Sequence, residues 1–486
     1  MSRYKLGYNV IYLLCSKAAY IAASFALYIV LVRAFDRYEI NIFGLAIAFN
    51  NLFIVVVDFG VTHVIIRLSA SYTRENLLSV FLSGIAVKCI YVLFWYAILY
   101  VGVYIMYQDD LTQKAIYIGC LSALVRSFSE YIDGISTGIG RSELAAVFNV
   151  IQYFLIFSLC TIIGYFLKWG LMPVLYCYCF VMSFSFVMRL LWILKYVGMK
   201  SKIIKIISLL KELIYESPKF GISLITLALT GSNLCLIIIS LIDSTKTDLA
   251  IFQGAQKIIG LTIIFGGVIG QSLYAAASNA IAKKNEEELY SYMQRSLHLL
   301  TVLSFGSMVF FSIMGQYIVN LLYAGRLEGT AGLLFIISIG LPLGLLIQIP
   351  YVNLAAAKKQ GITMVIVLTI GLISIPVVYY STEIWKLQGT AFAYVIMLSI
   401  QCIILIFAQK IVLGHLPNFI ELWKIILASG AMGILLYLMR ESSFPTILTG
   451  LIGTVSYLII LILFKEDEIL FGPYMPAIKH KFRSIR

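Results

Sequence analysis

The stretch NVIYLLCSKAAYIAASFALYIVLVRAFDRYEINIFGLAIAFNNLFIVVVDFGVTHVIIR, residues 9–67, decides the fold. It contains two apolar runs, 9–32 and 42–66, with a short polar segment between them. A helix needs about 20 mostly apolar residues to cross the hydrocarbon core of a bilayer. Both runs meet this length, so the stretch predicts two consecutive membrane-spanning helices.

The same pattern of long apolar runs and short polar loops continues along the chain. Of the 486 residues, 61% are hydrophobic and 12% are charged, and this is about half the charged share of a soluble domain. The composition therefore predicts one all-α polytopic membrane domain and no soluble domain. We expect about fourteen transmembrane helices, at residues 9–32, 42–66, 78–106, 115–137, 145–167, 173–197, 220–242, 250–280, 297–322, 331–354, 362–380, 389–411, 421–438 and 446–464.

The charged residues of the loops predict how the chain is oriented. An even number of spans places both termini on one side of the membrane. With the N-terminus in the cytoplasm, the cytoplasmic segments collect about 22 Lys and Arg residues against about 8 in the opposite loops, which the positive-inside rule favours. The same distribution accounts for the net charge of +13, so we expect no nucleic-acid partner.

A weak internal repeat divides the chain. Ile42-Phe43 and Ile251-Phe252 open comparable spans that end in small residues before a polar loop, which indicates duplication. Because six is even, the halves are expected to be parallel lobes, related by a pseudo-twofold axis along the membrane normal, with a central cavity between them. The predicted parts are an N-terminal six-helix lobe (1–197), a cytoplasmic amphipathic connector (198–219), a C-terminal six-helix lobe (220–411), two additional helices (412–464) and a basic cytoplasmic tail (465–486). The alternative for the connector is a plain orienting loop.

Ionisable side chains inside the spans are the candidate functional residues. Placing such a side chain in a span costs about 3 kcal/mol on insertion scales, so it usually faces a cavity or a partner. Arg126, Glu130 and Asp133 follow one another at i, i+4 and i+7 and therefore share one helical face. For the acids Asp58, Glu130 and Asp133 we weigh two roles, ion coupling and structural charge pairing.

The cations of the spans suggest the kind of substrate. Lys17, Lys88, Arg126 and Lys257 lie in spans with little compensating acid. Such a surplus suits a phosphate or pyrophosphate head group, so we predict that these four residues line the cavity and bind the substrate. Lys257 has no acid within two turns of its own span, and snorkelling toward an interface is its alternative. His298 is expected near the cytoplasmic interface.

The sequence lacks the motifs of several enzyme classes. No GxxxxGK[ST] segment occurs, so direct use of ATP is not expected. No HExxH, GxSxG or paired-cysteine metal motif occurs, and the 8 Cys are scattered and interpreted as packing residues. We predict a transporter, not an enzyme, without cofactor or metal. A membrane enzyme of glycan assembly is the less favoured alternative, because the predicted outward loops are short.

Several residues resemble a known family. They are the Arg33 exit from the first span, Phe43-Gly44 at the start of the second, Asp58-Phe59-Gly60 near its end, and the turns at Gly140-Arg141 and Ala357-Lys358. Over about residues 5–410 the chain resembles Wzx-type O-antigen and polysaccharide flippases of the multidrug/oligosaccharidyl-lipid/polysaccharide (MOP) exporter superfamily. Many O-antigen flippases have twelve spans, whereas the extra pair here is similar to lipid II flippases and some exopolysaccharide transporters, which leaves the glycan open.

The resemblance implies a function. It implies two six-helix lobes with alternating access, and a lipid-linked oligosaccharide on undecaprenyl pyrophosphate that moves from the cytoplasmic to the periplasmic leaflet of the bacterial inner membrane. Membrane lipids and other polysaccharide-assembly membrane proteins are the implied partners, in O-antigen and lipopolysaccharide biosynthesis. The alternative in the same superfamily is a multidrug or cation exporter, for which an acid-rich cavity would be expected instead of a basic one.

Overall fold

The computed structural model describes residues 3–71, 76–197, 206–229, 231–242, 248–440 and 445–464. In these ranges all regular secondary structure is helical, and each predicted span lies on one helix or on consecutive helices. The all-α polytopic fold class is therefore confirmed. The predicted basic tail (465–486) and the first part of the predicted connector (198–205) lie outside the described residues.

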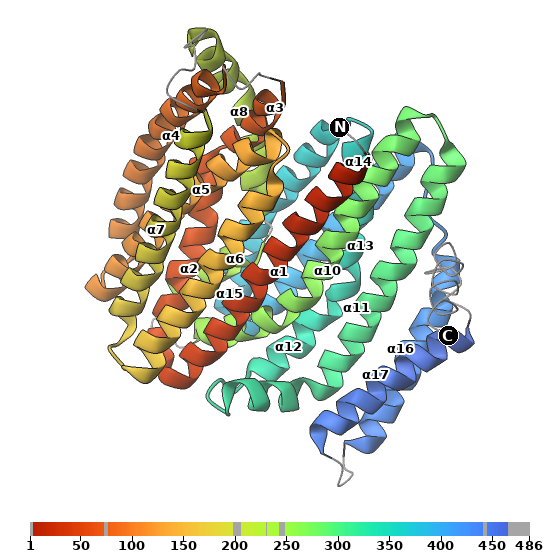
Figure 1. Ribbon diagram of the computed structural model, residues 1–486. Coiled ribbons are helices and arrows are strands. Elements are labelled where there is room, and N and C mark those ends of the chain that lie inside the picture. Colours follow the sequence, from red (N-terminus) through yellow and green to blue (C-terminus); the bar gives the residue numbers. More distant parts are fainter. Residues whose placement is uncertain are drawn as a thin grey trace, which may run out of the picture. The chain divides into compact units, whose positions relative to one another are not determined.

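The helices group into two compact units, and the first consists of residues 1–254 and 367–390 (Figure 1). The long helix α10 (Asp248–Ala282) begins in this unit, and the middle of α15 (Gln360–Leu413) also belongs to it. The other elements of the unit are α1 (Arg3–Ala34), α2 (Arg37–Asp58), α3 (Val61–Ser71), α4 (Leu77–Met106), α5 (Asp110–Gly138), α6 (Ser142–Thr161), the π-helical turn η2 (Ile162–Phe166), α7 (Leu171–Val197), α8 (Ile206–Leu229) and α9 (Ser232–Ile242).

The second unit consists of residues 255–366 and 391–486. Besides the remaining parts of α10 and α15, its elements are α11 (Glu286–Tyr323), α12 (Thr330–Ile339), α13 (Leu341–Leu346), α14 (Gln348–Ala356), the 3-10 turn η3 (Ile420–Leu422), α16 (Trp423–Met439) and α17 (Thr446–Leu463). The predicted division into two six-helix lobes, residues 1–197 and 220–411, differs from this grouping by contact and stays a prediction.

Length and apolar composition identify nine membrane-spanning helices among the described residues, or ten if the pair α12 and α13–α14, bent by 51°, is one span. The fourteen predicted spans exceed this number for three physical reasons. Helix α15 has 54 residues but is interrupted at Trp385 and Lys386, so it holds two predicted spans. Helix α5 carries the charged face and is therefore not among the nine. The remaining two predicted spans lie on α8 and α9, which are separate helices, and on α16, which is short with 17 residues.

The break between α2 and α3 is held by close packing against α8 (Figure 1). Phe59 and Gly60 adopt left-handed backbone, with φ of 39° and 80°. A Cβ atom on Gly60 would lie 2.4 Å from the carbonyl oxygen of Ser217 and 2.6 Å from the backbone nitrogen of Gly221. A glycine is therefore required at position 60 both by its backbone conformation and by the approach of α8.

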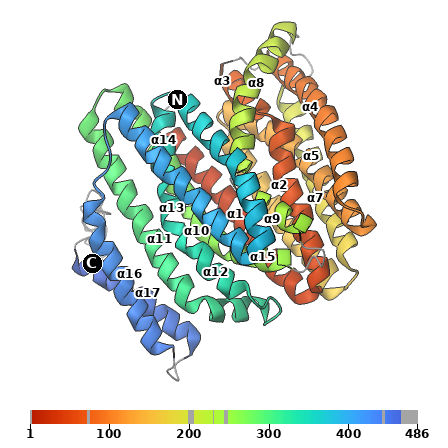
Figure 2. The same cartoon turned by 180° about the vertical axis from the view of Figure 1, so that it is seen from behind.

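In the second unit, α16 and α17 form an adjacent pair that packs against α11 (Figure 2). The hydroxyl of Tyr457 donates to the carbonyl oxygen of Val302 at 2.8 Å. The Tyr457 ring packs against Gly306 and occupies the space that a side chain at this position would need. Gly453 lets Leu436 approach in the same way between the two C-terminal helices. The last two helices are thus joined to this unit by close helix packing.

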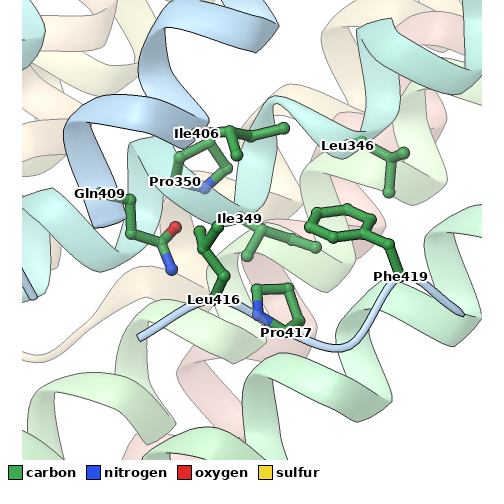
Figure 3. A pocket seen from close by; sticks show the side chains of 8 residues that line it. All are labelled: Leu346, Ile349, Pro350, Ile406, Gln409, Leu416, Pro417 and Phe419. Carbon is green, nitrogen blue, oxygen red and sulfur yellow. The ribbon is translucent and has the colours of Figure 1, made fainter. Parts of the chain in front are cut away.

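The segment that follows α15 is fastened to α11 by side-chain hydrogen bonds. The Gln294 side chain donates to the carbonyl oxygen of Asn418 at 3.1 Å and accepts from its backbone N–H at 2.7 Å. Beside this segment lies a small pocket, shown in Figure 3, lined by Leu346, Ile349, Pro350, Ile406, Gln409, Leu416, Pro417 and Phe419. Its volume of about 10 Å³ is at the lower limit for one water molecule, so it cannot hold a substrate.

We expect Gly60→Ala to destabilise the protein. Left-handed backbone costs an L-residue about 1–2 kcal/mol, and the clash with α8 adds to this cost. The thermal unfolding midpoint of the detergent-purified chain should therefore fall. Gly102→Ala in α4 is the matched control, because a Cβ atom there meets nothing within 4 Å, and its midpoint should be equal to or slightly above the wild-type value, since Ala is the better helix former. A Gly60→Ala midpoint equal to that of the control would contradict the packing described here.

Candidate functional site

Helices α1, α5, α6 and α7 pack together in the first unit (Figure 1). Charged side chains form a polar seam among these helices. We define it by the charged side chains Arg126, Glu130 and Asp133 of α5 and Arg189 of α7. The three α5 residues lie on one face of the helix, as their spacing predicts. Because each residue of the seam comes from a helix of the first unit, its geometry does not depend on the second unit.

At one end of the seam, Arg126 pairs with a carboxylate of its own helix. Its Nε lies 3.0 Å from Oε1 of Glu130, and the two side chains are 15% and 45% exposed. The guanidinium carbon lies 5.1 Å from the centroid of the Tyr20 ring, and the rings of Tyr20 and Tyr153 are 4.8 Å apart. The buried Nη1 of Arg126 has no hydrogen-bond partner among the described residues. This end of the seam therefore retains an unused donor beside an accessible carboxylate.

At the other end, Arg189 is buried and its donors are occupied. The side chain is 1% exposed, and its Nε lies 3.0 Å from Oδ1 of Asp133. The two terminal nitrogens donate to Gln152 Oε1 at 2.9 Å, to Ser185 Oγ and to Asn149 Oδ1 at 3.0 Å. The Asn149 amide also donates to Asp133 Oδ2 at 3.2 Å. The network joins α5, α6 and α7, so its geometry is that of a structural connection.

Lys88 and Asp58 form a second buried pair, close to the break after α2. Lys88 Nζ lies 2.8 Å from Asp58 Oδ1 with none of the lysine side chain exposed. It also donates to the carbonyl oxygen of Ser127 at 2.6 Å and to its hydroxyl at 2.8 Å. Asp58 accepts in addition from the backbone N–H and the hydroxyl of Thr62, at the start of α3. All three ammonium donors of Lys88 have partners here, so binding of a phosphate by Lys88 would require this pair to open.

Lys17 and Lys257 are the two other predicted cations. Lys17 is an exposed residue of α1, three positions before Tyr20 and thus on the same side of that helix. Lys257 is a partly buried residue of α10 and belongs to the second unit. His298 is buried on α11 in that unit, with its Nε2 3.1 Å from Nε2 of Gln294. Within the first unit the other predicted residues thus form separate ion pairs, and the functional roles of all the predicted residues stay predictions.

Sequence reasoning missed Arg189, although it completes the charge balance of the seam. The available signal was an arginine within the predicted sixth span, together with Asn149 and Gln152, which follow each other at i and i+3 on the preceding span. Structural charge pairing is one of the two roles weighed for Asp133, and Arg189 is its ion-pair partner in the structure.

The largest hollow described lies between α4 and α5 and is apolar. Its volume is about 620 Å³, and it is lined by Val92, Leu93, Tyr96, Ala97, Tyr100, Val101, Leu121 and Leu124. Tyr96 and Tyr100 are the lining residues with a polar group, and no charged side chain lines this hollow, whereas the seam holds four charged side chains. We therefore take the seam as the candidate functional site.

Comparison with known proteins decides the family. The family model described as polysaccharide biosynthesis protein matches residues 6–274, which is more than half of the chain. The chain belongs to this family. A second model, described as MatE, matches residues 222–380. No curated protein matches the chain. The resemblance to the MOP superfamily is confirmed by the two family models and the fold.

Solved structures of MOP-type proteins share the fold of this family member. A lipid II flippase MurJ in an inward closed conformation superimposes with a TM-score of 0.75 and 17% identity, over 94% of this chain and 100% of its own. An inward-facing multidrug resistance MATE family transporter has a TM-score of 0.66 and 16% identity, over 80% of this chain and 93% of its own. A MOP superfamily transporter from Pyrococcus furiosus has a TM-score of 0.59 and 14% identity, over 83% and 94%. At these identities the likeness shows the fold.

The Asp133–Arg189 pair yields a stability prediction. Removing one partner of a buried ion pair leaves an uncompensated charge and costs about 3–5 kcal/mol. Arg189→Met and Asp133→Leu should therefore each lower the thermal unfolding midpoint strongly, and the double variant should recover part of the loss because neither charge remains. The exposed pair Asp110–Lys114 of the same helix is the matched control, since surface pairs contribute about 0–1 kcal/mol. Single variants as stable as Lys114→Gln would contradict a structural role for Arg189.

Proposed function

We propose that this chain is a flippase for oligosaccharides linked to undecaprenyl pyrophosphate, which it moves from the cytoplasmic to the periplasmic leaflet of the bacterial inner membrane by alternating access. The observation that carries the proposal is the match of residues 6–274 to the polysaccharide biosynthesis protein family. Both termini are placed in the cytoplasm in this proposal, as the distribution of Lys and Arg favours.

The extent of the structural likeness supports a lipid-linked substrate. The lipid II flippase aligns with 94% of this chain, whereas the inward-facing MATE transporter aligns with 80%. The chain carries α16 and α17 beyond the twelve preceding predicted spans, and these helices pack against α11. Surface polysaccharide such as O-antigen is the proposed product, and other polysaccharide-assembly membrane proteins are the proposed partners.

The exposure and hydrogen bonding of the seam support a proposal for the residues that meet the substrate. Arg126 combines partial exposure with an unused donor, and Lys17 is exposed one turn away from Tyr20 on α1. We propose that Arg126 and Lys17 contact the substrate, and a substrate contact of Lys257 in the second unit stays a separate prediction. Lys88, Asp58 and Asp133 are held in buried pairs and would act by keeping the helices in place.

A second candidate function is export of drugs or other cations, which the MatE match of residues 222–380 favours. A cation site requires an accessible carboxylate, and Glu130 is the acid of the seam with 45% exposure. Against this function, Arg126 already neutralises Glu130, and a cation would have to displace it. The flippase is therefore the better-supported proposal.

Gene deletion and complementation test the proposal. Deletion should abolish surface polysaccharide and leave lipid-linked repeat units in the cytoplasmic leaflet, and the wild-type gene should restore both. Arg126→Gln should reduce the restored polysaccharide about ten-fold, because a charge-assisted contact contributes about 1.5–3 kcal/mol. Lys114→Gln on the same helix should restore it fully. Normal surface polysaccharide with raised drug sensitivity in the deletion strain would instead identify an exporter.

A further inference from the structure

The charges of Arg126 and Glu130 compensate each other at the accessible end of the seam. The two groups are joined at 3.0 Å. A pyrophosphate placed beside them would be attracted by the guanidinium and repelled by the carboxylate at nearly equal distances, so the two Coulomb energies largely cancel at any local dielectric constant. The pair therefore favours a ligand without net charge at this point.

The same pair offers hydrogen bonds of both kinds. Nη1 of Arg126 is buried and has no partner among the described residues, while Glu130 is 45% exposed. A guanidinium can only donate and a carboxylate can only accept. Two neighbouring hydroxyls can satisfy both groups at once, since one accepts from Arg126 and the other donates to Glu130. Both bonds are charge-assisted, and such bonds are about twice as strong as neutral ones.

Three tyrosines complete the surroundings of the pair. The Tyr20 ring lies 5.1 Å from the Arg126 guanidinium carbon and 4.8 Å from the Tyr153 ring. Tyr153 and Tyr178 are each 8% exposed, and both hydroxyls are within electrostatic range of the guanidinium. Tyrosine rings present an apolar body with a polar tip. A sugar ring has the complementary character, with a face of C–H groups and an edge of hydroxyls.

We infer that Arg126, Glu130, Tyr20, Tyr153 and Tyr178 form a site for an uncharged sugar residue of the lipid-linked substrate, and not for its pyrophosphate. This inference rests on the proposed flippase function and names the part of the substrate that the site recognises. The consequence is selectivity for the glycosylated lipid. A bare lipid carrier would leave the donor and the acceptor of the site unsatisfied, and sites built for hydroxyl groups reject ligands that lack them.

Binding of two lipid probes to the full-length chain in nanodiscs tests the inference. The probes are undecaprenyl pyrophosphate and undecaprenyl pyrophosphate that carries one neutral N-acetylhexosamine. The wild type should bind the sugar-bearing probe about ten-fold more tightly. Glu130→Gln and Arg126→Gln should each remove that difference by weakening the binding of the sugar-bearing probe. Tyr20→Leu should weaken the binding of the sugar-bearing probe, and Tyr20→Phe, which keeps the ring, should weaken this binding less.

The matched control is Asp110→Asn, which neutralises the acid of an exposed i,i+4 pair on the same helix and should change neither affinity. If Arg126→Gln fails to fold, Glu130→Gln and Tyr20→Leu decide, because Glu130 is half-exposed and Tyr20 is not part of a buried ion pair. Tighter binding of the bare probe by Glu130→Gln than by the wild type would overturn the inference, because a pyrophosphate site would bind its anion more tightly without the carboxylate. Equal wild-type affinities would also overturn it and leave the flippase proposal standing. A wild type that binds neither probe would overturn the flippase proposal itself.

Discussion

A charged side chain inside a bilayer has to be compensated, and the first unit depends on how this requirement is met. Lys88 and Asp58 compensate each other between α4 and the break after α2, with no lysine surface exposed. Arg189 and Asp133 do so between α7 and α5, with α6 contributing amides. Each of these pairs joins different helices and uses nearly all of its hydrogen-bonding capacity. Such pairs are costly to break, since the charge that stays behind is buried.

The Arg126–Glu130 pair meets the same requirement in a different way. Its two charges lie on one helix, so the ion pair itself joins no two helices, while the guanidinium also lies against the Tyr20 ring of α1. Its carboxylate is half-exposed and one guanidinium nitrogen has no partner among the described residues. The Lys88–Asp58 and Arg189–Asp133 pairs therefore hold helices together, whereas we propose that the Arg126–Glu130 pair receives a ligand. Tyrosines gather around this pair, and their rings add an apolar surface to it.

Much of the fold could be predicted because membrane spans are determined by local composition. Every predicted span lies on helix in the described residues. The interruptions were not predicted, because they depend on contacts between distant segments. The break at Phe59-Gly60 needs the backbone of α8, and the interruption at Trp385-Lys386 divides what would otherwise be a single long helix. The common face of Arg126, Glu130 and Asp133 follows from helical spacing alone. The partner of Asp133 could not be predicted in this way, because Arg189 is 56 residues away in the sequence.

Family and fold are those of MOP-superfamily transporters, and we propose that the cargo is a lipid-linked oligosaccharide whose sugar is recognised by the Arg126–Glu130 pair. The most direct measurement is translocation in proteoliposomes that contain only the purified chain. The probe is undecaprenyl pyrophosphate with a fluorescently labelled N-acetylhexosamine, and a membrane-impermeant quencher reports the leaflet in which it lies. We expect the wild-type chain to move the probe between leaflets faster than protein-free liposomes do, and Arg126→Gln to move it about ten-fold more slowly than the wild type. Probe movement at the protein-free rate, in vesicles that do transport a cationic dye, would contradict the account.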